Sequence, residues 1–232
     1  MTIRRMRTSW ALPLLLALGC SSPATDPEGT GDGGAPPPNG SQDAGVPSFP
    51  DLHVMPTTTH SGFDGAHAYR VPVAVYGGKN ATLVASDPSL VDIVPTKLVD
   101  PANDDGEYFM VTTKKAGTVT LTANAGSSSA SASLTIAPYT LDQYNVGQGR
   151  YTNAAASGPA CVSCHAEAGG IDHSPSRLAS VKDTDVVTVI TTGILVEGSP
   201  ITQVKHKWAV SNTEAAGLVA YLRALEPRGF TK

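Results

Sequence analysis

The sequence is poor in several residue types, and each shortage excludes a class of protein. Only three of the 232 residues are cysteines, which argues against a fold held together by disulfides. Charged residues make up 16% of the chain, and no stretch of it gathers lysine and arginine into a basic stripe. Nucleic acid is therefore not an expected partner. The apolar run from Trp10 to Leu18 is too short to cross a bilayer.

The same apolar run follows a basic start, Arg4, Arg5 and Arg7, and the two together are typical of a secretory signal over residues 1–19. Without this segment the chain has 20 acidic residues against 13 lysines and arginines, a net charge of about −7. Hydrophobic residues make up 41% of the sequence, as expected of a soluble globular protein.

The end of the signal, Leu16-Ala17-Leu18-Gly19-Cys20, resembles the lipobox of bacterial lipoproteins, although Ala17 stands where leucine is usual. The resemblance implies that Cys20 is acylated, becomes the first mature residue and anchors the protein to a membrane. Ser21, in place of Asp, implies the outer membrane, on either its periplasmic or its outer face. The alternative is an ordinary cleaved signal that happens to contain a cysteine.

Residues 20–50 lack what a folded core needs. They are rich in Gly, Pro, Ser and Asp, with no Lys or Arg over residues 21–49 and almost no aliphatic side chains. Such a composition cannot bury enough apolar surface to fold, so we expect a flexible tether here.

Residues 51–138 change to short β-branched runs separated by turn signals. Strict alternation over Val119, Leu121 and Ala123 indicates strands with one buried face. The expected strands are Tyr69–Tyr76, Ala81–Ala85, Val91–Val94, Tyr108–Thr112, Thr118–Ala123 and Ser131–Ile136. Two segments, residues 83–88 and 115–121, resemble bacterial immunoglobulin-like domains of group 2, which implies a β-sandwich.

Three histidines, His53, His60 and His67, recur every seven residues near the start of this region. This spacing is not that of a zinc finger or of helical ligands, and no cysteine accompanies them. We therefore interpret them as surface histidines in preference to a metal site.

Residues 139–232 carry helix signals. Thr140 with Gln143, and Ser211 with Glu214, each form a capping-box pattern at the start of an expected helix. The first helix is expected to run to about Tyr151, and the second to stop before Pro227, with Leu218 and Leu222 on its buried side.

The segment Cys161-Val162-Ser163-Cys164-His165 is the C-x-x-C-H pattern of covalent haem attachment. Each sulfur adds across a haem vinyl group, and the imidazole of His165 then lies where it can bind the iron. A thiol redox pair would instead be expected in a βαβ unit, which the sequence does not indicate. A zinc site would need a fourth ligand with suitable spacing, and no second cysteine pair exists.

About 90 residues around this motif, from 142 to 230, resemble a class I cytochrome c domain. Gly147 and Tyr151 resemble the small and aromatic residues where the terminal helices cross, opposite Leu218 and Tyr221. The resemblance implies that Pro175 shapes the proximal haem pocket. It also implies that Val189 to Ile194 end a middle helix, with Gly193 as its cap, against the strand propensity of these β-branched residues.

No methionine follows Met110, so the methionine that class I cytochromes place on the distal side is missing. Lys205-His206-Lys207-Trp208 lies near the equivalent place, and His206 is therefore the expected distal ligand, with His173 as the second candidate. A second imidazole in place of a thioether would lower the reduction potential.

The sequence thus predicts two domains, an all-β immunoglobulin-like sandwich over residues 51–138 and an all-α cytochrome c fold over residues 139–232. The expected function is electron transfer through one covalent haem c to a redox partner protein, without an enzyme's catalytic constellation. Two alternatives are a haem-based sensor, which needs a displaceable distal ligand, and a surface adhesion protein in which haem is incidental.

Overall fold

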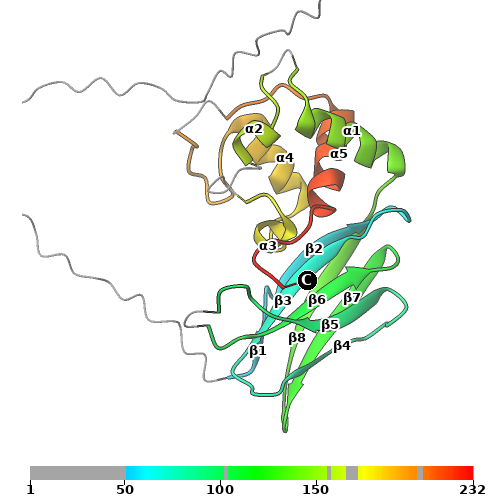
Figure 1. Ribbon diagram of the computed structural model, residues 1–232, viewed down its shortest axis with the longest axis vertical. Coiled ribbons are helices and arrows are strands. Elements are labelled where there is room, and N and C mark those ends of the chain that lie inside the picture. Colours follow the sequence, from blue (N-terminus) through cyan, green and yellow to red (C-terminus); the bar gives the residue numbers. More distant parts are fainter. Residues whose placement is uncertain (1–50, 102–103, 156–157, 166–171, 203–205, 232) are drawn as a thin grey trace, which may run out of the picture. The chain divides into compact units, whose positions relative to one another are not determined.

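A computed structural model describes residues 51–101, 104–155, 158–165, 172–202 and 206–231 (Figure 1). These residues contain eight strands followed along the chain by five helices. The strands are β1 (His53–Met55), β2 (Thr58–Phe63), β3 (Arg70–Tyr76), β4 (Thr82–Ala85), β5 (Val91–Thr96), β6 (Glu107–Thr113), β7 (Gly117–Ala125) and β8 (Ser128–Pro138). The helices are α1 (Leu141–Thr152), α2 (Val162–His165), α3 (Pro175–Leu178), α4 (Asp183–Thr192) and α5 (Asn212–Arg223).

The strands form two four-stranded sheets, in the orders β1-β3-β6-β5 and β2-β8-β7-β4 (Figure 1). All pairs are antiparallel except β2 and β8, which run parallel with Thr59 opposite Leu134. Side chains from both sheets meet in one apolar core that includes Val73, Val111 and Leu121. The sheets therefore bury one face each, as the alternating pattern requires.

The six expected strands are present, each within a few residues of its expected bounds. In β7 the alternate residues Val119, Leu121 and Ala123 are buried, which confirms the strand period. β1 was missed because its three residues, His53–Met55, are too few for a strand period to show, and β2 because its polar residues and glycine carry no apolar alternation. They are strands because their backbones pair with β3 and β8, and this pairing cannot be read from their own residues.

The helix signals are confirmed at both capping boxes. The Thr140 hydroxyl accepts a hydrogen bond from the Gln143 amide, and Ser211 does the same for Glu214. α4 is a helix in spite of its β-branched residues, and it ends at Gly193 in the left-handed conformation. Here the C-terminal cap and the packed environment outweigh strand propensity. No described helix is long and apolar enough to span a membrane.

The expected fold class is wrong for residues 139–232, because no separate all-α cytochrome c domain is evident. The chain is mostly β: strands hold more residues than helices, and α2 and α3 have only four residues each. All described residues fall within one compact unit, Gln42–Lys232. The helices therefore do not close an independent fold of their own.

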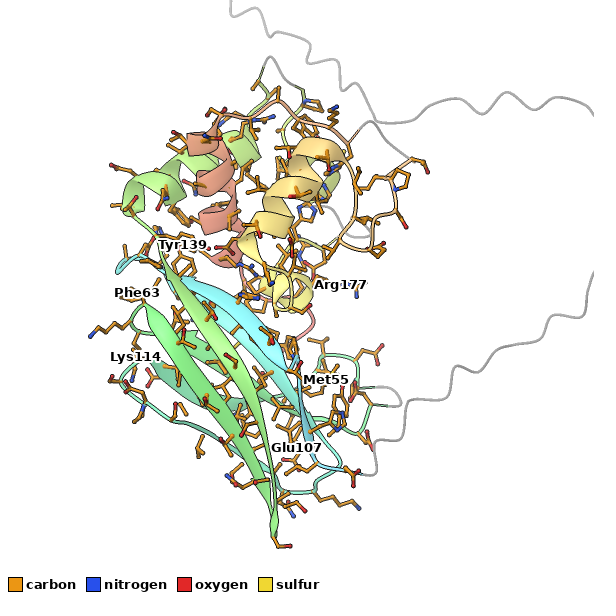
Figure 2. The ribbon with its side chains drawn as sticks, turned by 180° about the vertical axis from the view of Figure 1, so that it is seen from behind. Met55, Phe63, Glu107, Lys114, Tyr139 and Arg177 are labelled. Carbon is orange, nitrogen blue, oxygen red and sulfur yellow. The ribbon has the colours of Figure 1, made fainter. Side chains whose placement is uncertain are left out.

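The helices bury a small cluster of their own, which includes Tyr151, Leu218 and Leu222, but the segment is also bonded to the sheets. The amide of His60 in β2 donates to the carbonyl of Ala179, at 2.7 Å, and Ala179 belongs to the core between the sheets. The amide of Tyr139 likewise donates to the carbonyl of Phe63 at 2.8 Å, and Figure 2 shows both residues at the same end of the strands. Sequence periodicity detects an amphipathic helix but not the element against which it packs.

A buried arginine strengthens the same contact region. Arg223 at the end of α5 is 1% exposed, and its guanidinium donates to the carbonyls of Leu178 and Val181 and to the carboxylate of Asp183. The other carboxylate oxygen of Asp183 accepts a hydrogen bond from the Tyr139 hydroxyl at 2.6 Å. Arg223 thereby holds together α5, the turn between α3 and α4, and the residue that follows β8.

Candidate functional site

The C-x-x-C-H segment folds as the one-turn helix α2. The amides of Cys164 and His165 both donate to the carbonyl of Cys161, each at 3.2 Å. Residues three and four apart share a face of a helix, so Cys161 lies on the same face as Cys164 and His165. The two thiols are not joined in a disulfide. Cys161 therefore neighbours both Cys164 and His165, while the thiol of Cys164 is exposed and the imidazole of His165 is buried.

The protonation of the first thiol bears on its chemistry. Burial raises the pKa of the Cys161 thiol above its usual value, and the nearby Arg150 opposes the rise only in part. A raised pKa keeps the group protonated at neutral pH, whereas redox-active pairs and zinc sites use the thiolate. The surroundings of Cys161 therefore do not activate it as a thiolate.

Three imidazoles gather beside this helix. His165 is buried, and the ring of His173 is stacked on it with 3.5 Å between ring centroids and 26° between planes. The ring of His206 stands edge-on to His165, with centroids 6.2 Å apart and planes at 87°. The structure thus brings both distal candidates to the proximal one, from segments 8 and 41 residues further along the chain.

The two additional rings have unused ligand atoms. One buried ring nitrogen of His173 and one of His206 have no hydrogen-bond partner among the described residues. Burial, together with positive charge on His165, His206 and Arg228, lowers the pKa of His173 to about 3. Both observations suit ligands, because metals bind the neutral imidazole and an unpaired buried nitrogen is costly.

Ring spacing distinguishes the two candidates. Two metal–nitrogen bonds of about 2 Å, plus about 1 Å from nitrogen to ring centre on each side, separate ligand rings by about 6 Å. His165 and His206 match this separation at 6.2 Å, whereas the 3.5 Å between His165 and His173 is that of stacked rings. The centroid separation of His165 and His206 is therefore compatible with two imidazoles on one iron, whereas that of His165 and His173 is not.

No cluster of three or more His, Cys, Asp or Glu side chains able to hold a metal occurs in the described part of the chain. Axial binding of haem iron needs only one or two such side chains, since the porphyrin supplies the other ligands. The two surface hollows, of about 380 and 390 Å³, are lined by neither the thiols nor the three imidazoles.

Trp208 is a supporting residue to which the sequence assigned no role. Its amide donates to the carbonyl of Ile190 in α4 at 3.1 Å, and the Arg150 guanidinium lies 5.4 Å from its ring centre. A side chain at Gly158 would collide with the Trp208 ring, at 2.1 Å. These contacts fix the segment that carries His206, whose ring is edge-on to Trp208. The sequence feature that could have indicated this role is the position of Trp208, an aromatic residue two positions after the candidate ligand His206.

Pro175, expected to shape the proximal pocket, is buried as the first residue of α3, and Ser174 caps that helix. Its carbonyl accepts the hydrogen bond from the Ala179 amide at 3.0 Å. The fixed φ of proline suits this first helical position. Its proposed role toward haem stays a prediction.

The three histidines of the β region have separate surroundings. His53 stacks on Tyr76, while His67 bonds to the Asp64 carboxylate at 2.7 Å and stacks on Tyr144 in α1. His60 lies in β2. The predicted lipidation site Cys20, the signal and the tether up to residue 50, and Lys205 lie outside the described residues.

Comparison with known proteins adds little to this geometry. No family profile matches the sequence, and no curated protein matches it. Among solved structures, an I-band fragment of titin is similar over 39% of this chain and 31% of its own, at 9% identity and a TM-score of 0.24. A likeness this weak carries no argument about fold or function.

Proposed function

We propose that the protein is a lipid-anchored electron carrier outside the cytoplasm, with one haem attached to Cys161 and Cys164. His165 would be the proximal iron ligand and His206 the distal one. The observation that carries the proposal is a buried His165, within a C-x-x-C-H turn, with a second imidazole at the spacing of two axial ligands.

When bound, haem supplies an iron that takes up and releases one electron. The chain's own residues do the rest. Cys161 and Cys164 hold the group covalently, α2 orients His165, and Trp208 with Arg150 fixes the segment of His206. Because His165 and His206 would both be bound to the iron, the chain would leave it no open position for a substrate, and we expect a carrier for a redox partner protein rather than an enzyme.

The anchor belongs to the same proposal. Acylation of Cys20 would attach the chain to the outer membrane, and the Gly- and Pro-rich residues that follow would separate the folded unit from the lipid surface. The β-sheets would then act as a spacer or docking module.

The test is expression with cytochrome maturation machinery, followed by haem staining of the denatured protein and by optical and EPR spectra. We expect covalent haem with a low-spin bis-imidazole spectrum, lost in Cys161→Ser/Cys164→Ser. His206→Ala should convert the iron to high spin, while His173→Ala should leave it low spin. Absence of covalent haem from the wild type would refute the proposal.

The other outcomes are equally distinct. If His173→Ala loses the low-spin signal and His206→Ala keeps it, the distal assignment to His206 is wrong. If the reduced wild type binds carbon monoxide as readily as His206→Ala does, the distal ligand is displaceable. That result would favour a haem-based ligand binder over an electron carrier.

A further inference from the structure

The last described residues, 226–231, form a strap between the haem-attachment region and the first sheet. At one end the Val99 amide donates to the carbonyl of Gly229 at 2.9 Å, and the Thr231 amide donates to the carbonyl of Lys97 at 2.8 Å. These bonds flank an isolated antiparallel bridge between Leu98 and Phe230, just after the edge strand β5 ends at Thr96. The strap is thus fixed to the sheet through backbone hydrogen bonds.

At the other end of the strap, Arg228 reaches the proximal ligand. Its guanidinium donates to the carbonyl of His165 at 3.2 Å, across 63 residues of sequence. Its Nε lies 3.7 Å from the carboxylate of Asp172. The amide of Arg228 donates to the Ser174 hydroxyl at 3.2 Å, and its carbonyl accepts from the Ser176 hydroxyl at 2.7 Å.

We propose that Arg228 is a positioning residue for His165, and that the strap makes the sheet edge at β5 part of the structure that holds the haem. This inference rests on the proposed function. The guanidinium restrains the backbone at the ligand itself, while Asp172, Ser174 and Ser176 restrain Arg228 in turn. The sheet then restrains the iron environment, because strand pairing at Lys97 and Val99 fixes the strap on the far side of Arg228.

The charge of Arg228 has a second effect. Ferric haem carries one more positive charge than ferrous haem, so a nearby guanidinium favours the ferrous form and raises the potential. The Arg228 side chain is 46% exposed. Salt should therefore screen this contribution, whereas it should not alter the restraint of the His165 carbonyl.

Two substitutions separate the effects in the full-length, haem-loaded protein. Arg228→Gln removes both the charge and the charged donor, so we expect a lower potential and an EPR spectrum split into several low-spin species. The fall in potential should shrink as salt is raised. Arg228→Lys keeps the charge but loses the planar fork, so we expect a potential near that of the wild type and a heterogeneous EPR spectrum.

A third variant tests the sheet. Deletion of residues 229–232 removes the bonds to Lys97 and Val99 and places a C-terminal carboxylate on Arg228. Because that carboxylate itself changes the potential, the EPR spectrum is the readout for this variant, and we expect it to be heterogeneous. Arg177→Gln, at an exposed arginine of α3 (Figure 2), is the matched control and should behave as the wild type. Haem content and thermal unfolding of each variant show whether it has folded.

The experiments distinguish a failure of the proposed function from a failure of the inference about Arg228. If the wild type carries no covalent haem, the proposed function and this inference both fall. If haem is attached but Arg228→Gln and Arg228→Lys keep the wild-type EPR spectrum and potential, and the deletion keeps the wild-type EPR spectrum, only the inference is overturned. A change in Arg177→Gln equal to that in Arg228→Gln would also overturn it, since it would show an unspecific effect of surface charge.

Discussion

Two glycines on α1 allow the contact between α1 and α5 to be tested with one chemical change. A Cβ added at Gly147 would lie 1.9 Å from the carbonyl oxygen of Gly217 on α5, whereas a Cβ at Gly149 would meet nothing within 4 Å. Gly147→Ala and Gly149→Ala therefore differ in packing but not in chemistry. Alanine in a helix is favoured over glycine by about 0.5–1 kcal/mol, so Gly149→Ala should stabilise the protein.

The same change at Gly147 meets backbone, which cannot rotate aside. The methyl must move by about 1.5 Å to reach ordinary contact, and overpacking of this kind costs about 3 kcal/mol. After the gain in helix propensity, the net loss is about 2 kcal/mol. For a chain of this size it lowers Tm by about 4–8 °C, while Gly149→Ala should raise Tm by about 1–4 °C.

The measurement is thermal unfolding of both variants and the wild type, followed by far-ultraviolet circular dichroism, with urea unfolding as a second probe. Equal Tm shifts for Gly147→Ala and Gly149→Ala would refute the reasoning, because the two helices would then not approach closely at Gly147. A loss confined to Gly147→Ala would show that this small residue sets their distance.

Two further predictions concern the contacts between helices and sheets. Arg223→Met leaves the carbonyls of Leu178 and Val181 without their donor, so the free energy of unfolding should fall by about 3 kcal/mol or more in urea titrations; an unchanged midpoint would contradict the role of Arg223. Burial acts to raise the pKa of Asp64, but hydrogen bonds from His67 and Ala66 outweigh it and lower the pKa. Asp64 therefore adds stability above the pKa of its unfolded carboxyl and loses it as pH falls through the lowered value. Asp64→Asn should lose less stability than the wild type between about pH 5 and pH 2, and parallel pH curves would contradict this.

Local features of the fold were predictable because short-range interactions specify them. The capping boxes at Thr140 and Ser211 involve residues three apart, and the alternation in β7 is readable from every second side chain. The helix α4 was also predictable, but only through a family resemblance, since its β-branched residues alone indicate a strand. β1 and β2 were missed because their pairing partners, not their own residues, make them strands.

The expectation of an independent all-α domain failed for a different reason. Helix signals in residues 139–232 were correct one by one, and the expected crossing of Gly147 and Tyr151 with Leu218 and Tyr221 is present. The helix signals contain no information about the contacts that the helices make with the sheets. The buried guanidinium of Arg223 and the bond from His60 to Ala179 join residues far apart in the sequence. Such contacts depend on the chain's path in space, which no local pattern encodes.

For the site, the sequence by itself predicts the chemistry. Two thiols and an imidazole within five residues form the pattern of covalent haem attachment, and this pattern is local because one turn of helix places Cys161 next to both Cys164 and His165. Tertiary structure decided which other groups face His165. His173 and His206 approach it from 8 and 41 residues away and Arg228 from 63, and only the packing of helices and strap against the sheets brings them together. Covalent chemistry is local in the chain, whereas ligand selection and positioning depend on distances that folding alone establishes.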